Sequence, residues 1–404
     1  MPAPSTPPLD GDRTVSVAIV GAGFTGLSTA LSLAEQGVDV VVLEAHEPGW
    51  GASGRNGGQV NPGLKHDPDQ VERDLGAAAV TFSGDAPNIV FGLIDRHRIA
   101  CEALQSGTLR AAFHRRTLAG LARTAAEWAR RCPDVEIVDR ETMAGLTGTD
   151  RYLGGMIDRR GGQLNPLGFA RGLAAAAIDA GAAVHGDTPV SQLSKDGSQW
   201  RLETPTGTLR AEKIVLATNG YTDDLWPGLR RSLVPVFSAI AASEPVPDDV
   251  MPSRSSLYEM GDITVYYRKN RDGRILMGGR SVQREIDRPE QLQYLIDYAI
   301  RLWPTLRGVT WPWAWSGQLA VTADHYPHVH APDETVLVCL GYNGRGVALS
   351  TAMGPELARR IVGGPSEELP LPVTEFRGIP LHGLWKSAVQ ARVVYGRIRD
   401  ALGL

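Results

Sequence analysis

Residues 15–44 read VSVAIVGAGFTGLSTALSLAEQGVDVVVLE and decide the fold. A β-branched apolar run meets three glycines spaced G-x-G-x-x-G, and an amphipathic helix pattern and a second apolar run follow. Gly21 permits a tight turn, Gly23 lets a pyrophosphate approach the helix N-terminus, and Gly26 allows the helix to pack closely on the strand. Glu44 ends the second run, where a carboxylate can accept hydrogen bonds from an adenosine ribose. The stretch therefore predicts a strand–turn–helix–strand unit that binds a dinucleotide.

The bulk composition is typical of a soluble globular protein that is too long for a single core. The chain has 404 residues, of which 43% are hydrophobic and 21% charged, so two domains are expected. The net charge of −4 at pH 7 creates no basic field, which argues against nucleic acid as a partner. Apolar runs stay short of the roughly 20 residues of a membrane span, so none is expected. The three cysteines (Cys101, Cys132 and Cys339) are far apart, which predicts reduced thiols, no metal site and a cytoplasmic protein.

Three further stretches point to a flavin rather than a nicotinamide. SGRNGGQ (53–59) follows the first unit at once, and its glycines place bare backbone amides against a flat ligand. KIVLATNG (213–220) closes a middle unit whose earlier strand, centred on Val190, can contact an adenine through its backbone. GYNGRG (341–346) begins a helix whose N-terminus can face the pyrimidine edge of a flavin, where negative charge develops on reduction. Taken alone, these stretches also fit a surface loop, an unrelated buried strand and a second phosphate loop.

Together these residues carry a resemblance to a known family. Over residues 14–375 the chain resembles the D-amino-acid-oxidase-like superfamily of FAD-dependent oxidoreductases, because its motifs occur in the order found there. These motifs are SGRNGGQ, GGQLNPLGFARGLAAAA, LATNGY, YYR…DGRILMGG and GYNGRGVALSTAMG. Within that superfamily the chain resembles the γ-glutamylputrescine oxidase-like branch. The resemblance implies FAD as cofactor, a flavin-binding domain beside a sheet-containing substrate domain, and oxidation of a C–N bond to an imine that water hydrolyses.

The expected fold is α/β, with a Rossmann-type FAD-binding domain and an α+β substrate domain built on an antiparallel sheet. Nucleotide-type elements occur at the start, in the middle and near the end of the chain, so the FAD-binding domain is expected to be discontinuous. The expected division is a flexible N-terminus over 1–13, the FAD-binding domain over 14–75, 150–232 and 315–376, the substrate domain over 76–149 and 233–314, and a C-terminal helix within 377–404.

The expected FAD ligands lie in the glycine-rich turns and among the residues that flank them. They are Gly21, Gly23, Phe24, Thr25, Gly26, Glu44, Ala45, Ser53, Gly54, Arg55, Asn56, Gly57, Gly58, Gln59, Val190, Asn219, Gly220, Gly341, Asn343, Gly344, Arg345, Gly346 and Val347.

On the substrate side the resemblance favours Tyr267, which it places on the sheet that covers the flavin; an ordinary strand aromatic is the alternative. Gln59 and Tyr342 complete the candidate catalytic set. An aromatic wall suits an amine, because it excludes water and stabilises residual positive charge. No general base is identified, and the histidines of DHYPHVH (324–330) are expected to cap a loop. The further pocket candidates are Tyr258, Trp315, Gln318 and Asn343.

Three departures from relatives narrow the chemistry. The segment 315–324, where some relatives attach flavin through a cysteine, has none, so FAD is expected to be noncovalent. Ala348 stands where relatives acting on glycine-type substrates carry a lysine for the α-carboxylate, which disfavours a small α-amino acid held in that way. Leu276 stands where sarcosine-oxidase-like members place a lysine that promotes reaction with oxygen. The electron acceptor, oxygen or another compound, therefore stays open.

The leading hypothesis is an FAD-dependent oxidoreductase that acts on a primary or secondary amine, such as a γ-glutamylated polyamine or an alkylamine, by hydride transfer to flavin N5. One alternative is oxidation of an amino acid, imino acid or aminosulfonate, with Arg268 or Arg345 holding the acid. Another is the flavin subunit of a multi-subunit dehydrogenase, docked through the basic tail helix. A nicotinamide enzyme or plain nucleotide-binding module is the third. The oligomeric state is not predicted.

Overall fold

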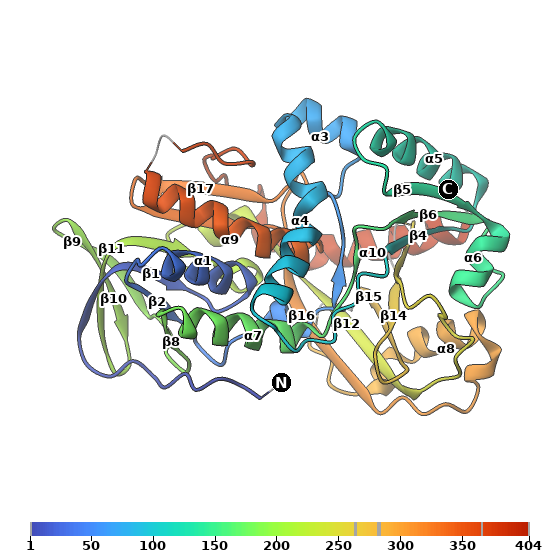
Figure 1. The fold of residues 1–404 in the computed structure, drawn as a ribbon, viewed down its shortest axis with the longest axis horizontal. Coiled ribbons are helices and arrows are strands. Elements are labelled where there is room, and N and C mark those ends of the chain that lie inside the picture. The colour runs from blue at the N-terminus through green and yellow to red at the C-terminus, as the bar shows by residue number, and fades with distance from the viewer. Residues whose placement is uncertain (1, 262–264, 281–283, 365–366, 403–404) are drawn as a thin grey trace.

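Two large sheets lie side by side and divide the molecule (Figure 1). The computed structural model describes residues 2–261, 265–280, 284–364 and 367–402. The sheet on the left of Figure 1 carries the first βαβ unit, and the sheet on the right is mostly antiparallel. This is the expected combination of a Rossmann-type domain with an α+β domain.

The first sheet is parallel at its centre, in the order β18-β11-β1-β2-β8. Antiparallel β17 pairs with β18, and the hairpin of β9 and β10 pairs with the first half of β11. Helix α1 packs between α7 and α9 on one face. The bounds are β1 (Arg13–Val20), β2 (Val40–Leu43), β8 (Ala183–His185), β9 (Gln192–Asp196), β10 (Gln199–Thr204), β11 (Gly207–Leu216), β17 (His328–Asp333), β18 (Val336–Leu340), α1 (Phe24–Glu35), α7 (Pro166–Asp179) and α9 (Gly346–Gly363).

The second sheet runs β16-β12-β15-β14-β13-β4-β6-β5, and only the β13–β4 pair is parallel. Helix α8 covers one of its faces near β15. The bounds are β4 (Thr108–Ala112), β5 (Val135–Asp139), β6 (Gly154–Asp158), β12 (Val234–Pro245), β13 (Ser256–Glu259), β14 (Tyr266–Lys269), β15 (Arg274–Arg280), β16 (Trp313–Val321), α5 (Arg115–Ala129), α6 (Arg140–Thr147) and α8 (Gln293–Leu302).

The two faces of the second sheet have different surroundings. Side chains at Leu109, Leu257, Tyr267 and Met277 belong to one buried cluster with α8, which we call the outer-face core. Their strand neighbours point to the other face, because successive residues of a strand alternate. That inner face carries, among others, Thr108, Arg110, Ser238, Tyr258 and Tyr266.

Between the sheets run short connecting elements and a long helix. These are α2 (Ala52–Arg55), β3 (Gln59–Val60), α3 (Pro68–Leu75), α4 (Ala77–Arg96) and β7 (Gly162–Gln163). By length and composition α4 could cross a membrane. However, 56% of its apolar window is buried inside the protein and it packs against α9, as a core helix does.

Strand pairing departs from the expected domain division at two places. β6 was assigned to the FAD-binding domain by sequence, but it pairs with β4 and β5 in the second sheet. β16 was assigned likewise, but it pairs with β12. Both strands lie next to flavin-type motifs in sequence, so only their hydrogen-bonding partners reveal where they belong.

The N-terminal segment is not the flexible lead that its composition predicts. Leu9 is 2% exposed, and its N–H donates to Thr188 Oγ1 at 3.1 Å. Thr206 Oγ1 donates to the carbonyl oxygen of Leu9, and Gly186 N donates to that of Thr6. The segment is therefore held against the loops around β8 and β10, where its backbone finds partners that the local sequence does not show.

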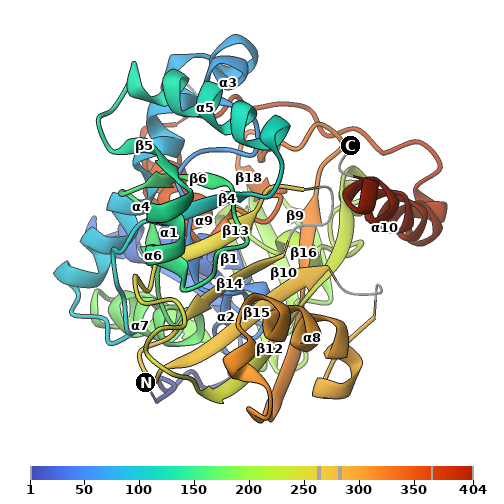
Figure 2. The same cartoon turned by 90° about the vertical axis from the view of Figure 1, so that its right-hand side faces the viewer.

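Other expectations about single elements also change. The Val190 position is not in a strand, since β8 ends at His185. The expected helix near the C-terminus exists as α10 (Trp385–Leu402). It lies at the periphery (Figure 2), and Leu384, Val394 and Tyr395 on or beside it are more than half exposed.

Candidate active site

The first glycine turn adopts the geometry that its spacing predicts. Gly21 has φ +105°, a left-handed conformation that favours glycine, as the chain leaves β1. A Cβ on Gly26 would overlap the carbonyl oxygen of Gly21 and would also lie 3.2 Å from a methyl group of Ile19. Helix α1 can therefore approach β1 only because residue 26 has no side chain.

Glu44 closes this unit and faces the turn. Its Oε2 accepts from Ala22 N at 2.7 Å, and its Oε1 accepts from His46 N at 3.1 Å. Burial raises the pKa of Glu44, although these N–H groups favour the carboxylate. Thr188 N donates to the Glu44 carbonyl oxygen at 2.7 Å, which brings the segment leading to Val190 beside Glu44.

We predict that Glu44→Gln weakens FAD binding about 10- to 100-fold, because a ribose hydroxyl would lose a charged acceptor. Because the folded-state pKa of Glu44 is raised, the protonated carboxyl group stabilises the folded apoprotein relative to the unfolded chain. This stabilisation is lost as pH rises through the folded-state pKa, and the ionised carboxylate then destabilises the apoprotein. Apo Glu44→Gln should therefore match or exceed the wild type in melting temperature at pH 7, and the difference should shrink as pH falls.

Fluorescence titration with FAD and thermal melts of the apoprotein measure both effects. Glu47→Gln is the matched control, because Glu47 is exposed and pairs with Arg171 at the surface at 3.0 Å. An unchanged FAD affinity in Glu44→Gln would exclude the ribose role.

The SGRNGGQ stretch folds onto the first turn. Ser53 Oγ accepts from Phe24 N at 3.0 Å, which ties α2 to the start of α1. Part of the side-chain donor capacity of this loop is used on its own backbone: Arg55 Nε donates to Trp50 O at 2.7 Å, and Asn56 Nδ2 donates to Ser53 O at 2.7 Å. Their role is to shape the loop around the cavity.

The late glycine motif joins both earlier ones. Tyr342 Oη lies 2.7 Å from Thr25 Oγ1, in a buried contact between the last and the first motif. Gly341 N donates to Asn219 Oδ1 at 3.0 Å, which joins the late motif to LATNG at the end of β11. Thr322 N donates to Asn343 Oδ1 at 3.0 Å. Motifs more than 300 residues apart thus meet at one place.

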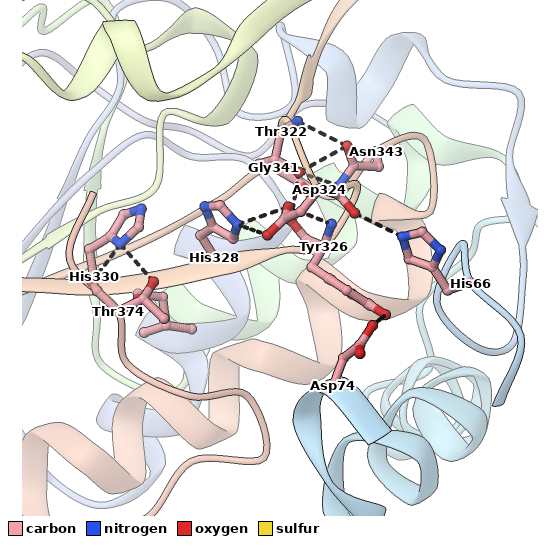
Figure 3. A network of polar contacts seen from close by, with 11 residues as sticks. His66, Asp74, Thr322, Asp324, Tyr326, His328, His330, Gly341, Asn343 and Thr374 are labelled. Atoms are coloured by element: carbon pink, nitrogen blue, oxygen red, sulfur yellow. Dashed lines mark hydrogen bonds and ion pairs between the residues drawn. The ribbon is translucent and has the colours of Figure 1, made fainter. Parts of the chain in front are cut away.

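The histidine cluster supports this turn from outside. His328 pairs with Asp324 at 3.0 Å, and His66 Nε2 donates to the Asp324 carbonyl oxygen at 2.8 Å (Figure 3). His330 Nδ1 donates to Thr374 O at 2.7 Å. None of these side chains lines the cavity described next, which agrees with their expected role in capping a loop.

The converging motifs surround a cavity of about 980 Å³, including the part that opens to solvent. Many of the residues expected from sequence line it: Gly23, Phe24, Thr25, Ser53, Arg55, Asn56, Gly57, Gln59, Asn219, Tyr342, Asn343, Gly344, Gly346 and Val347. Others are set back from its wall: Gly21, Gly26, Glu44, Ala45, Gly54, Gly58, Val190, Gly220, Gly341, Arg345, Tyr258, Tyr267, Trp315 and Gln318. Residues that sequence reasoning missed complete the wall: Ala52, Asn61, Ala217, Ser238, Tyr266, Gly317, Leu319, Ala320 and Ser350.

The expectation that Tyr267 faces the cavity is wrong. Tyr267 is 1% exposed, lies in the outer-face core with its ring edge-on to Trp303 at 5.1 Å, and shares a hydrogen bond with Tyr152. Its neighbour Tyr266 lines the cavity, with Oη 2.9 Å from Ser238 Oγ. A shift of one residue changes the face of a strand. The sequence shows that Tyr266 and Tyr267 point to opposite faces of the strand, but it does not show which of the two faces is turned to the cavity.

Two of the pocket candidates brace the site instead of lining it. Trp315 Nε1 donates to Arg55 O at 2.9 Å and so fixes the end of α2 against β16. Gln318 Nε2 donates to Gly220 O at 2.5 Å. Gln59 does line the cavity, and its Nε2 donates to Leu257 O at 2.8 Å, which ties the loop to β13.

The cavity suits a flat, extended ligand. A Cβ on Gly57 would lie 2.7 Å from the Tyr266 ring, so the loop reaches this wall only as bare backbone. The N-termini of α1 and α9 both border the cavity, where helix dipoles favour anionic groups such as phosphates or a reduced ring system. Within the residues that the structure describes, no group of three His, Cys, Asp or Glu side chains could hold a metal.

A family model described as FAD-dependent oxidoreductase (DAO) matches residues 16–360. The chain belongs to the DAO family of FAD-dependent oxidoreductases. Similar proteins include the probable oxidoreductase OrdL of Rhizobium meliloti (strain 1021), 32% identical over 91% of this chain and 87% of that protein. The gamma-glutamylputrescine oxidoreductase of Escherichia coli (strain K12) is 30% identical over 88% of this chain and 85% of that protein.

Solved structures agree with this DAO-family fold. The glycine oxidase from Geobacillus kaustophilus superposes with a TM-score of 0.77, covering 91% of this chain and all of that one, at 22% identity. Such a likeness supports the fold alone. Family membership makes FAD the cofactor of this protein, and the glycine-lined wall and the two helix N-termini of the cavity fit that group.

Proposed function

We propose that this DAO-family enzyme oxidises the C–N bond of a primary or secondary amine, of the γ-glutamylated polyamine or alkylamine type, to an imine that water hydrolyses. The similarity to the Escherichia coli gamma-glutamylputrescine oxidoreductase supports this substrate class. The observation that carries it is the character of the cavity wall. Arg55 is the only Asp, Glu, Lys or Arg among the described residues that line it, and its Nε is bonded to Trp50 O.

A wall with Arg55 as its one charged side chain among the described residues favours an amine over a small α-amino acid. A carboxylate entering this cavity would lose its hydration, and the cation it could meet in the lining, Arg55, is already bonded through Nε to Trp50 O and stacked over the Trp50 ring at 4.6 Å. Ala348 is fully buried in α9, so the lysine that holds α-carboxylates in some relatives has no equivalent here. Arg268 is engaged as well, because its Nε donates to Gly57 O at 2.5 Å and its Nη1 donates to Gln163 Oε1 at 2.9 Å.

The residues of the chain act by position and exclusion of water. FAD supplies the acceptor for the hydride that leaves the α carbon of the amine. Tyr266 forms a wall beside the reacting carbon, and burial raises the pKa of Tyr266 to about 12, so its phenol stays neutral. A neutral amine placed against such a wall needs no strong base, since its nitrogen lone pair forms the C=N bond of an iminium ion as the hydride departs, and that ion loses its N–H proton to water or is hydrolysed directly.

We further propose that FAD is bound without a covalent bond and that the enzyme works in the cytoplasm. All three cysteines are free thiols, and none lines the cavity. Burial raises the pKa of Cys101 and of Cys339 to about 12, which keeps both as unreactive thiols. Free thiols also suit a reducing compartment.

The proposal is tested by anaerobic reduction. Purified enzyme should be yellow, and a panel of primary and secondary amines should bleach the visible flavin band, with the best substrates well ahead of glycine and D-alanine. Admission of air then separates an oxidase, which recovers its colour within a turnover, from a dehydrogenase that waits for another acceptor. If amino acids reduce the flavin and amines do not, the proposed substrate class is wrong.

A further inference from the structure

Two arginines lie over the ring of one tyrosine on the inner face of the second sheet. The guanidinium carbon of Arg110 is 5.6 Å from the ring centroid of Tyr258, and that of Arg345 is 5.0 Å from it. Arg345 Nη2 also donates to Tyr258 Oη at 2.7 Å, and its Nη1 donates to Pro62 O at 3.0 Å. We call this group the arginine pair.

The positive charge of the pair is not balanced. Neither guanidinium has an ion-pair partner among the residues that the structure describes, and Asp158, an acid that acts electrostatically on Arg345, is bonded to Arg160 at 2.7 Å. Arg110 is only 7% exposed and has no hydrogen bond within the described chain. Burial lowers the pKa of Arg345, and the charge of Arg110 acts in the same direction. Two buried cations therefore repel each other here.

Such an arrangement is costly unless something anionic completes it. A buried charge without a partner costs several kcal/mol, and a guanidinium with free donors offers a planar fork that matches a carboxylate. The nitrogens of Arg110 are not among the fully enclosed unpaired atoms of the described chain, so each borders solvent-accessible space.

The pair stands close to the FAD cavity but beyond its wall. Gly344 and Gly346, on either side of Arg345, line the cavity. Arg110 is directly opposite Tyr258 in the β4–β13 register, and Tyr258 is directly opposite the cavity residue Tyr266 in the β13–β14 register. Two strand spacings separate Arg110 from Tyr266, which is about 10 Å. With the reacting carbon beside Tyr266, as proposed, an α-carboxylate lies one carbon from the C–N bond, whereas the strand that carries Arg110 is two strand spacings from Tyr266.

We propose that Arg110 and Arg345, lying over Tyr258, bind a carboxylate of the substrate that is several bonds away from the C–N bond being oxidised. This proposal rests on the proposed amine oxidation, and it narrows the substrate class to ω-amino acids and acylated amines that end in an acid. The cavity receives the amine, and the arginine pair holds the opposite end of the molecule. Specificity then comes from the length between the two groups.

The kinetic test compares amines of equal length with and without the acid. With 6-aminohexanoate and hexylamine, the wild type should favour the acid in kcat/KM by at least 10-fold. Arg110→Met should reduce this preference about 30-fold or more, since a truncated partner of a buried charge pair costs at least that much. Arg110→Lys should restore part of it. Arg151→Met is the matched control, because exposed Arg151 lies over Phe113 at the same 5.6 Å, and it should retain the full preference.

A binding test does not depend on turnover. Glutarate should raise the melting temperature of the wild-type holoenzyme and perturb its flavin spectrum, whereas glutaramide should do neither. Arg110→Met should fold and melt no lower than the wild type, because it removes an unpaired buried cation, and it should lose the response to glutarate. Inorganic phosphate distinguishes a substrate subsite from a general anion site.

The outcomes separate the two proposals. If no amine reduces the flavin but glutarate binds through Arg110, amine oxidation fails and the carboxylate site stands. If amines are oxidised without preference for the acid, or if Arg110→Met keeps that preference, the carboxylate site is wrong. Binding of phosphate as tight as that of glutarate would also overturn the assignment to a substrate carboxylate.

Discussion

Replacing Gly26 by alanine should give a protein that no longer holds FAD, with an affinity at least 100-fold weaker than that of the wild type. The added Cβ would overlap the carbonyl oxygen of Gly21, which is backbone and cannot rotate away. Helix α1 must then move off β1, and overpacking of this kind costs about 1–3 kcal/mol of unfolding free energy. The movement also displaces the helix N-terminus from the phosphates, so binding suffers more than folding.

Titration of the apoprotein with FAD and chemical denaturation measure the two effects separately. Gly92→Ala is the matched control, because Gly92 lies inside α4 and an added Cβ there meets nothing within 4 Å. That variant should keep its flavin and gain slightly in stability. A yellow Gly26→Ala protein with ordinary affinity would show that the close approach of α1 to β1 is not required.

The adjacent tyrosines of β14 should respond to truncation in opposite ways. Tyr267→Ala should lose about 3–5 kcal/mol of unfolding free energy, since it leaves a cavity in the outer-face core and removes the hydroxyl group that bonds to Tyr152. Its flavin spectrum and rate of flavin reduction should change little. Tyr266→Ala should slow flavin reduction at least 10-fold, because it removes the wall that places the amine and admits water.

Denaturant titration and anaerobic stopped-flow absorbance distinguish the two roles. Tyr395→Ala is the control for loss of a tyrosine, since Tyr395 is 56% exposed on α10; it should match the wild type in both measurements. If Tyr267→Ala slows reduction as much as Tyr266→Ala at equal flavin content, the assignment of the two faces of β14 is incorrect.

Local sequence was sufficient wherever a residue acts within its own strand–turn–helix unit. The turn at Gly21, the close packing at Gly26 and the acid at Glu44 all follow from spacing within one βαβ unit, and the structure places each as expected. The late motif could be recognised for the same reason, since a glycine run after an apolar strand can begin a helix in only a few ways.

Sequence was insufficient wherever the outcome depends on a distant partner. β6 and β16 look like continuations of flavin-binding segments, yet their partners lie in the second sheet. The N-terminal segment is polar and rich in proline, yet Leu9 is buried and its N–H donates to Thr188 Oγ1. Neither pairing leaves a local signal, because the complementary group lies far away in the chain.

The amino-acid sequence by itself determined the cofactor class, the discontinuous Rossmann-type domain and the backbone turns that border the ligand, because those depend on glycine spacing and strand–helix order over short stretches. Only the tertiary structure decided that Tyr266 rather than Tyr267 faces the cavity, and that Arg110 meets Arg345 across Tyr258. Both depend on the face that a sheet presents once its strands have paired. Strand pairing is a long-range choice, set by the packing of the whole molecule.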